Sequence, residues 1–273
     1  WGVTVTNLTA FAEVTISDAN LPEYYDTTGI VANSDGVVCL WLPDGRYYFA
    51  IGENYYLVVV DGGNTTASTF TPTGLTVNGD DVAFLFGDGW NFDSSDTLCI
   101  TNAGSYVIDG TDQTRTNIAI QVSANADITI TNVTIGLDIR DDKPAFALTN
   151  SAEVALVLQG TNQFKGASTY AGVYVPEGTA IDISGDGSLV TMSGGRSAGI
   201  GAGWDDSTTG AISISGGNIT AVGLSGGAGI GGGYKYSGFG SISISGGVVT
   251  ATGTSGAAGI GCGDGDDSYT PTP

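Results

Sequence analysis

The feature that most constrains this chain is a repeat of about 30 residues in its C-terminal part. The segments "GAISISGGNITAVGLSGGAGIGGG" (210–233) and "GSISISGGVVTATGTSGAAGIGCG" (240–263) align at an offset of 30 residues, and "GTAIDISGDGSLVTMSGGRSAGIGAG" (178–203) precedes them. Looser copies are "NADITITNVTI" (125–135) and "SAEVALVLQGTNQF" (151–164). A unit this small cannot bury its apolar face alone, so neighbouring copies must stack on one another.

Each repeat holds three short segments of alternating β-branched and small residues, separated by Gly or polar turns. This pattern predicts an all-β chain whose repeats form a right-handed parallel β-helix, with successive turns ~4.8 Å apart. We expect this β-helix to cover residues 75–263 in about six turns. Equivalent residues should then stack: Ile214 on Ile244, and Ile200 on Ile230 and Ile260.

The recurring "AGIG" segment has a structural interpretation. Its Ile should point into the solenoid, its Ala should fit a narrow corner, and its Gly residues should allow close backbone approach or backbone angles that other residues avoid. A phosphate-binding loop is disfavoured, since neither a helix nor a Lys-Ser/Thr pair follows. The threonines Thr191, Thr220 and Thr250 are expected to stack into a row on one strand surface.

Residues 1–70 have a different texture, with longer strand-like runs and many aromatic side chains such as Trp41, Tyr47 and Tyr55. We interpret this region as a small antiparallel β-sandwich of six or seven strands preceding the solenoid. Residues 264–273, "DGDDSYTPTP", are interpreted as an acidic Thr/Pro tail or linker.

Composition excludes several classes of function. The chain has no histidine, which removes Ser-His-Asp and Cys-His catalysis. Its net charge of −21 disfavours nucleic acid as a partner, and no apolar run suggests membrane insertion. The three cysteines, Cys39, Cys99 and Cys262, are expected to be small buried apolar residues.

The repeats resemble a family of bacterial surface proteins common in clostridia and other anaerobes. The resemblance rests on "GWNFDSSDTLCITNAGSYVIDG" (89–110), followed by the "ISISGG" and "GAGIGGG" segments, and covers roughly residues 74–263. It implies a secreted or cell-surface β-helix of a kind sometimes labelled carbohydrate-binding. It brings no catalytic motif.

Three variable loops follow the "AGIG" segments: "WDDSTTG", "YKYSGFG" and "DGDDSYT". They should lie on one flank, one turn apart. Aromatic faces beside carboxylates suit a sugar ring, which needs stacking and hydrogen-bond acceptors. Alternatively, the aromatic side chains only cover the solenoid edge. The candidate glycan-binding residues are Trp204, Asp205, Asp206, Tyr234, Tyr236 and Phe239.

The candidate metal ligands are Asp264, Asp266 and Asp267 in "GDGDDS", whose alternating acids resemble part of a calcium loop. The complete EF-hand pattern is missing, so a solvated acidic loop is the simpler interpretation. A second acidic cluster in "DIRDD" comprises Asp138, Asp141 and Asp142. Apart from calcium, no cofactor is expected.

These observations favour a non-catalytic protein that is secreted or at the cell surface, with a structural or adhesive role. Its expected partners are glycans or components of a host or cell surface. A catalytic carboxylate pair stays open as an alternative, because the many Asp residues allow such pairs without indicating one. Another alternative is a filament subunit joined head to tail through an uncapped β-helix end.

Overall fold

The computed structural model describes residues 2–6, 14–17, 30–51, 54–70, 73–84, 86–110, 117–235 and 238–265. The chain divides into two compact units, Trp1–Pro72 and Thr73–Pro273. Across the described residues, every regular element is a β-strand except a short 3-10 turn, η1 (Val82–Phe84). No helix in this part of the chain is long and apolar enough to cross a membrane. The all-β prediction is confirmed.

The N-terminal unit contains two antiparallel sheets. One sheet pairs β1 (Gly2–Val5) with β3 (Val38–Trp41), and the other has the order β2 (Val14–Ser17), β4 (Gly45–Ile51), β5 (Asn54–Asp61) and β6 (Asn64–Phe70). In the second sheet β4, β5 and β6 form a meander, because each of these strands pairs antiparallel with the next one along the chain.

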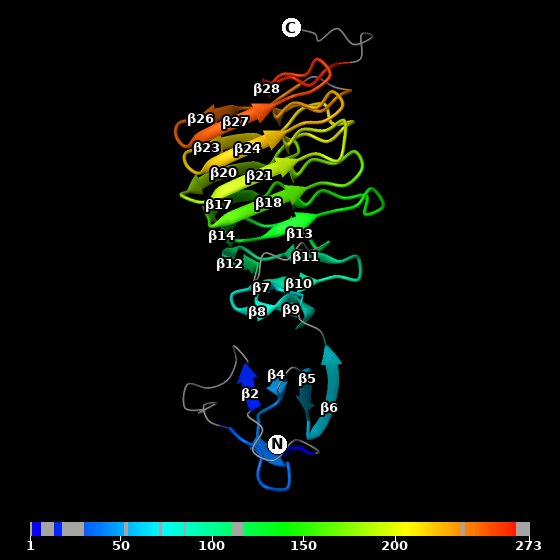
Figure 1. The fold of residues 1–273 in the computed structure, drawn as a ribbon, viewed down its shortest axis with the longest axis vertical. Coiled ribbons are helices and arrows are strands. Elements are labelled where there is room, and N and C mark those ends of the chain that lie inside the picture. The colour runs from blue at the N-terminus through cyan, green and yellow to red at the C-terminus, as the bar shows by residue number, and fades with distance from the viewer. Residues whose placement is uncertain are drawn as a thin grey trace. The chain divides into compact units, whose positions relative to one another are not determined.

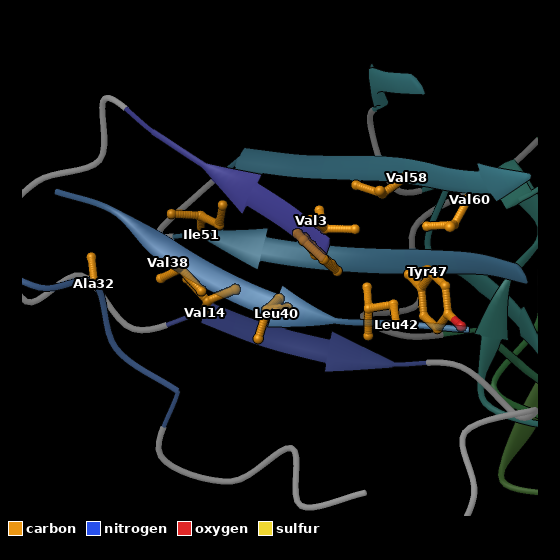
Figure 2. Packing of buried hydrophobic residues seen from close by; sticks show 11 residues of the cluster. Val3, Val14, Ala32, Val38, Leu40, Leu42, Tyr47, Ile51, Val58 and Val60 are labelled. Carbon is orange, nitrogen blue, oxygen red and sulfur yellow. The ribbon is translucent and has the colours of Figure 1, made fainter. Parts of the chain in front are cut away.

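Apolar side chains of both sheets form the core of this unit. Figure 2 shows them gathered between the strands. Alternation along β3 explains the arrangement, since Val38 and Leu40 are buried while Cys39 and Trp41 are exposed. Tyr47 is buried as well, and its hydroxyl donates a hydrogen bond to the carbonyl of Pro43 (2.8 Å). The alternating pattern therefore specifies the buried face.

The C-terminal unit is a parallel β-solenoid with three sheets, seen in Figure 1 as a stack of strands. Sheet I runs through β9 (Phe86–Gly87), β10 (Trp90–Phe92), β11 (Thr97–Ile100), β13 (Ala119–Val122), β16 (Phe146–Leu148), β19 (Val173–Tyr174), β22 (Ile200–Gly201), β25 (Ile230–Gly231) and β28 (Ile260–Gly261). Sheet II runs through β8 (Asp80–Asp81), β7 (Leu75–Val77), β12 (Gly104–Gly110), β14 (Ala126–Thr131), β17 (Glu153–Gln159), β20 (Ala180–Gly185), β23 (Ala211–Ile214) and β26 (Ile242–Ile244). Sheet III runs through β15 (Thr134–Gly136), β18 (Thr161–Lys165), β21 (Ser188–Met192), β24 (Asn218–Val222) and β27 (Val248–Thr252).

Each complete turn contributes one strand to every sheet, as in β22, β23 and β24. The described residues contain five such turns, matching the 5-stranded sheet III, with partial turns at both ends. The parallel β-helix is thus confirmed, with one complete turn fewer than expected.

The predicted ladders are present. Ile214 pairs with Ile244, and Ile230 pairs with Ile200 and Ile260. Ile200, Ile214 and Ile230 are completely buried. Burying such an aliphatic side chain contributes about 1.5–3 kcal/mol, so the repeated Ile positions carry much of the stability.

The "AGIG" corner has the backbone that the sequence suggested. Gly201, Gly231 and Gly261 have φ values of 136°, 131° and 124°, in a region that L residues rarely adopt. A Cβ on Gly231 would lie 2.1 Å from the carbonyl oxygen of Gly261 in the next turn. Both backbone angle and stacking distance therefore require Gly.

The expected row of Thr191, Thr220 and Thr250 is wrong in one member. Thr220 does pair with Thr250, but its neighbour in the preceding turn is Val190. Thr191 instead stacks on Ala221 and is fully buried. Successive residues of a strand face opposite sides, so an alignment shifted by one residue assigns the wrong face.

The cysteines also differ from expectation, since Cys39 and Cys262 are exposed, Cys99 is half-buried, and all three are free thiols. Cys39 and Cys99 lie at outward positions between buried neighbours. Cys262 directly follows β28, in the last turn that the structure describes.

The two ends of the solenoid differ. At the N-terminal end, β7 pairs antiparallel with β12 and β10 pairs antiparallel with β11, which closes that end with reversed strands. At the C-terminal end, β26, β27 and β28 are the last strands of their sheets. Ile244 and Ile260 are 41% and 47% exposed there, whereas Ile214 and Ile230, one turn below, are 0% exposed. The described residues leave this apolar end open.

Candidate functional site

The described parts of the variable loops lie one turn apart on the same flank. The amide of Lys235 donates to the carbonyl of Trp204 in the turn below (3.2 Å), and the amide of Tyr234 donates to the carbonyl of Arg196 (2.9 Å). One turn further on, the amide of Asp264 donates to the carbonyl of Gly226 (2.8 Å). Stacking of the solenoid therefore brings residues 31 to 38 positions apart into direct contact.

Aromatic and cationic side chains alternate on this flank. The Arg196 guanidinium carbon lies 5.5 Å from the ring centroid of Trp204 and 5.7 Å from that of Tyr234. The Lys235 ammonium lies 5.7 Å from the Trp204 centroid and 2.7 Å from Oδ1 of Asp205. These five residues are called the flank cluster below. Each cation–ring contact contributes about 0.5–1 kcal/mol at an exposed site.

Arg196 was absent from the expected site residues, although the repeats do carry a signal for it. It occupies the position at which the next two turns have Gly226 and Gly256. All three have positive φ: 56° at Arg196, 95° at Gly226 and 94° at Gly256. A long cationic side chain thus replaces Gly where the backbone is left-handed, a conformation that is unfavourable for Arg.

The predicted carboxylates are already engaged. Asp205 forms the ion pair with Lys235. Oδ2 of Asp206 accepts a hydrogen bond from the amide of Gly203 (2.7 Å), and its Oδ1 accepts one from the Tyr174 hydroxyl (3.2 Å). Burial, followed by the Asp206 carboxylate, raises the pKa of Tyr174 above its ordinary value. Asp206 therefore stabilises the loop more than it offers a free acceptor.

The rings are not freely exposed platforms. Trp204 and Tyr234 are half-buried, and the Tyr234 ring covers the backbone of Gly226, where a Cβ would lie 2.3 Å from Cδ2. Within the described residues, the buried Nε1–H of Trp204 has no acceptor. The cluster thus combines fixed rings with an exposed Arg196 side chain.

The remaining candidate residues lie apart or outside the described chain. Phe239 is 47% exposed and lies beside Gly261 of the last turn. In the described part of the chain, no contact joins it to Trp204 or Tyr234. Tyr236 lies outside the described residues, so its place in the site stays a prediction.

The acidic tail is described only in part. Asp264 lies over the backbone of Gly256, where a Cβ would be 3.0 Å from the carboxylate, while Asp266 and Asp267 fall outside the described residues. Among the residues that are described, "DIRDD" included, no three His, Cys, Asp or Glu side chains are grouped to hold a metal ion. Calcium binding at the tail stays a prediction.

A second concave surface lies on the outer face of sheet II, with a volume of about 510 Å³. Its carboxylates are Asp127, Glu153 and Asp182, with Ser105 and Asn125 beside them. The residues that line this groove include no aromatic side chain. It offers hydrogen-bond acceptors but no ring on which a sugar can stack, so it fits a glycan less well than the flank cluster does.

Comparison with known proteins agrees with the solenoid. A family model described as "Beta helix repeat" matches residues 212–234 and 242–264, the part of the solenoid that runs from β23 to β28. No curated protein and no solved structure matches the chain.

Proposed function

We propose that this β-helix repeat protein acts outside the cell, secreted or at a bacterial cell surface, as a non-catalytic structural or adhesive protein that contacts glycans. The observation that carries the proposal is the flank cluster, in which Trp204 and Tyr234 from successive turns flank Arg196. The fold is compatible with a structural or adhesive role, since a solenoid presents similar loops at regular intervals along one side.

The chemistry of the cluster suits a carbohydrate. Aromatic rings bind the C–H face of a pyranose, and a few polar groups at the rim fix its orientation. Trp204 and Tyr234 are held in place by neighbouring turns, so little side-chain entropy is lost on binding. Because they are half-buried, we expect contact through the accessible parts of their ring faces and through the Arg196 side chain.

A glycan array probed with the intact chain tests this proposal. We expect selective retention that falls at least ~10-fold in Trp204→Ala and in Tyr234→Ala, because each removes a ring of the cluster. Trp41→Ala is the matched control, since Trp41 is 77% exposed but belongs to the N-terminal unit. Retention lost equally in Trp41→Ala, or no retention by the wild-type chain, would contradict the proposal.

The open C-terminal end favours a second candidate function, that of a filament subunit joined through this end. Three edge strands, β26, β27 and β28, terminate their sheets together with Ile244 and Ile260 exposed. Unpaired edges of this kind favour strand addition by another chain. Simple head-to-tail stacking is disfavoured at the N-terminal end of the solenoid. The strands there pair antiparallel and so do not offer the parallel edge that the next turn of a solenoid would offer.

Electron microscopy and light scattering of the natively isolated protein test assembly. A filament subunit should form polymers with a constant subunit rise, and Ile244→Lys with Ile260→Lys should yield monomers. Val107→Lys is the control, since Val107 is 49% exposed on β12, away from the end. A monomer at high concentration would rule out assembly and leave the glycan proposal unaffected.

A further inference from the structure

We infer that the flank cluster recognises a sugar carrying a carboxylate, such as a hexuronic acid residue of a glycan, with Arg196 as the specificity-determining residue. The inference rests on the proposed glycan contact and goes further by naming the chemical class of the sugar.

The distribution of charge in the chain supports a negatively charged ligand at the flank cluster. The chain has only 7 Lys and Arg residues against 28 Asp and Glu, yet two of those cations, Arg196 and Lys235, belong to one cluster. Lys235 is neutralised by Asp205 at 2.7 Å. Among the described residues, no carboxylate is paired with Arg196, which interacts only with two rings through its guanidinium. One cationic group is thus left for a ligand on an otherwise acidic protein.

The geometry of the Arg196 guanidinium and the two rings beside it suits a carboxylate attached to a sugar ring. The planar guanidinium presents a fork of N–H donors that matches a carboxylate in a bidentate manner. Trp204 and Tyr234 flank it at 5.5 Å and 5.7 Å, so an anion bound there would lie beside aromatic surface. A uronic acid offers both parts, because its carboxylate is attached directly to a pyranose ring. Acetate would use only the fork, and a neutral sugar only the rings.

The backbone conformation at Arg196 also supports a role for this side chain in binding. Its φ of 56° lies in the left-handed region, where the equivalent residues of the next two turns are Gly226 and Gly256. Gly at this corner is therefore compatible with the fold, and Arg costs stability there. Unfavourable backbone conformations of this kind concentrate at functional sites. No structural contact of the guanidinium beyond the two rings compensates for it within the described chain.

The test compares two matched probes, methyl β-D-glucuronide and methyl β-D-glucoside, by ligand-observed NMR titration against the intact chain, with sodium acetate as a third probe. We expect the glucuronide to bind about tenfold more tightly than the glucoside, as a charge-assisted hydrogen-bonded pair implies. Acetate should compete only weakly. Arg196→Gly should abolish the preference for the glucuronide with little net change in thermal stability, because the backbone strain that it relieves and the two cation–ring contacts that it removes offset each other. Arg196→Lys, which keeps the charge but not the fork, should retain only part of the preference.

The outcomes separate this inference from the proposed function. Equal affinity for the two glycosides, both lost in Trp204→Ala, would overturn the carboxylate inference and leave glycan contact standing. Acetate competing as well as the glucuronide would also overturn it, since the site would then be a simple anion site. Binding of neither glycoside, together with an array on which nothing is retained, would overturn both.

Discussion

At the scale of single residues, Thr191 brings a hydroxyl into the interior of the solenoid. It lies on β21 between Phe164 and Ala221 of the adjacent turns, is fully buried, and its Oγ1 has no hydrogen-bond partner among the described residues. An unsatisfied buried hydroxyl costs about 1–3 kcal/mol. Thr191 is thus a polar residue at an apolar position.

Replacing Thr191 with Val should therefore stabilise the protein. The two side chains have nearly the same shape, so the change removes the hydroxyl without opening a cavity. We expect the free energy of unfolding to rise by about 1 kcal/mol, measured by urea denaturation. Thr220→Val, at an outward position of β24, is the control and should have little effect. Destabilisation by Thr191→Val would mean that the hydroxyl has a partner, such as a buried water.

The raised pKa of Tyr174 should make the free energy of unfolding depend on pH. Burial and Asp206 raise its pKa in the folded state above the ordinary value of 10.0, so the neutral phenol is favoured in the fold. Its contribution is fully present below that ordinary value and is lost as the pH rises above it, because the unfolded chain then releases the proton more readily. The difference in unfolding free energy between wild type and Tyr174→Phe should shrink above pH ~10. A difference that is constant from pH 8 to 11 would contradict this assignment.

At the scale of elements, the sequence period predicted which Ile residues stack in neighbouring turns and where the corners require Gly. It did not predict for every residue which side of its strand the side chain faces. The offset of 30 residues places Ile200 on Ile230 and Ile260 directly, because these segments are nearly identical. Within β21 the residues differ from those of β24, and a shift of one position was enough to assign Thr191 to the wrong face. The position of Arg196 beside two aromatic rings could not be predicted from residue type, because Trp204 and Tyr234 come from two successive turns.

The "AGIG" corner provides a matched pair of substitutions. Gly231 and Gly261 share a positive φ, but a Cβ on Gly231 would lie 2.1 Å from the Gly261 carbonyl oxygen. Among the described residues other than its chain neighbours, the atoms nearest to a Cβ on Gly261 would lie 3.8 Å away. Gly261→Ala should cost about 1–3 kcal/mol through backbone strain alone. Gly231→Ala should cost at least ~2 kcal/mol more, because adjacent turns must also separate. Equal melting temperatures for the two variants would contradict the role assigned to stacking.

At the scale of the whole molecule, the solenoid is a one-dimensional array whose ends have fewer partners than its middle. Antiparallel strands close the N-terminal end, and the described residues leave the C-terminal end apolar. The repeat pattern could not show the closing strands, since residues 75–100 have little similarity to the later repeats.

Amide hydrogen exchange should report this difference between the ends. In dilute solution, β26 and β27 should exchange at least ~10-fold faster than β23 and β24 one turn below, because a terminal turn opens without disrupting two neighbours. Protection that rises with protein concentration only in the last turn would identify this end as a self-association surface. Equal protection of both turns in the dilute monomer would show that something else covers the end.

Glycan contact at the flank cluster can be followed at Trp204 itself, through the indole NMR signals of the four Trp residues. The measurement is a titration of the ¹⁵N-labelled protein with the glycan best retained on the array, with the Trp204 signal assigned from Trp204→Ala. We expect the Trp204 indole signal to shift with saturation while that of Trp41 does not. A titration that shifts other signals and leaves that of Trp204 unchanged would contradict it.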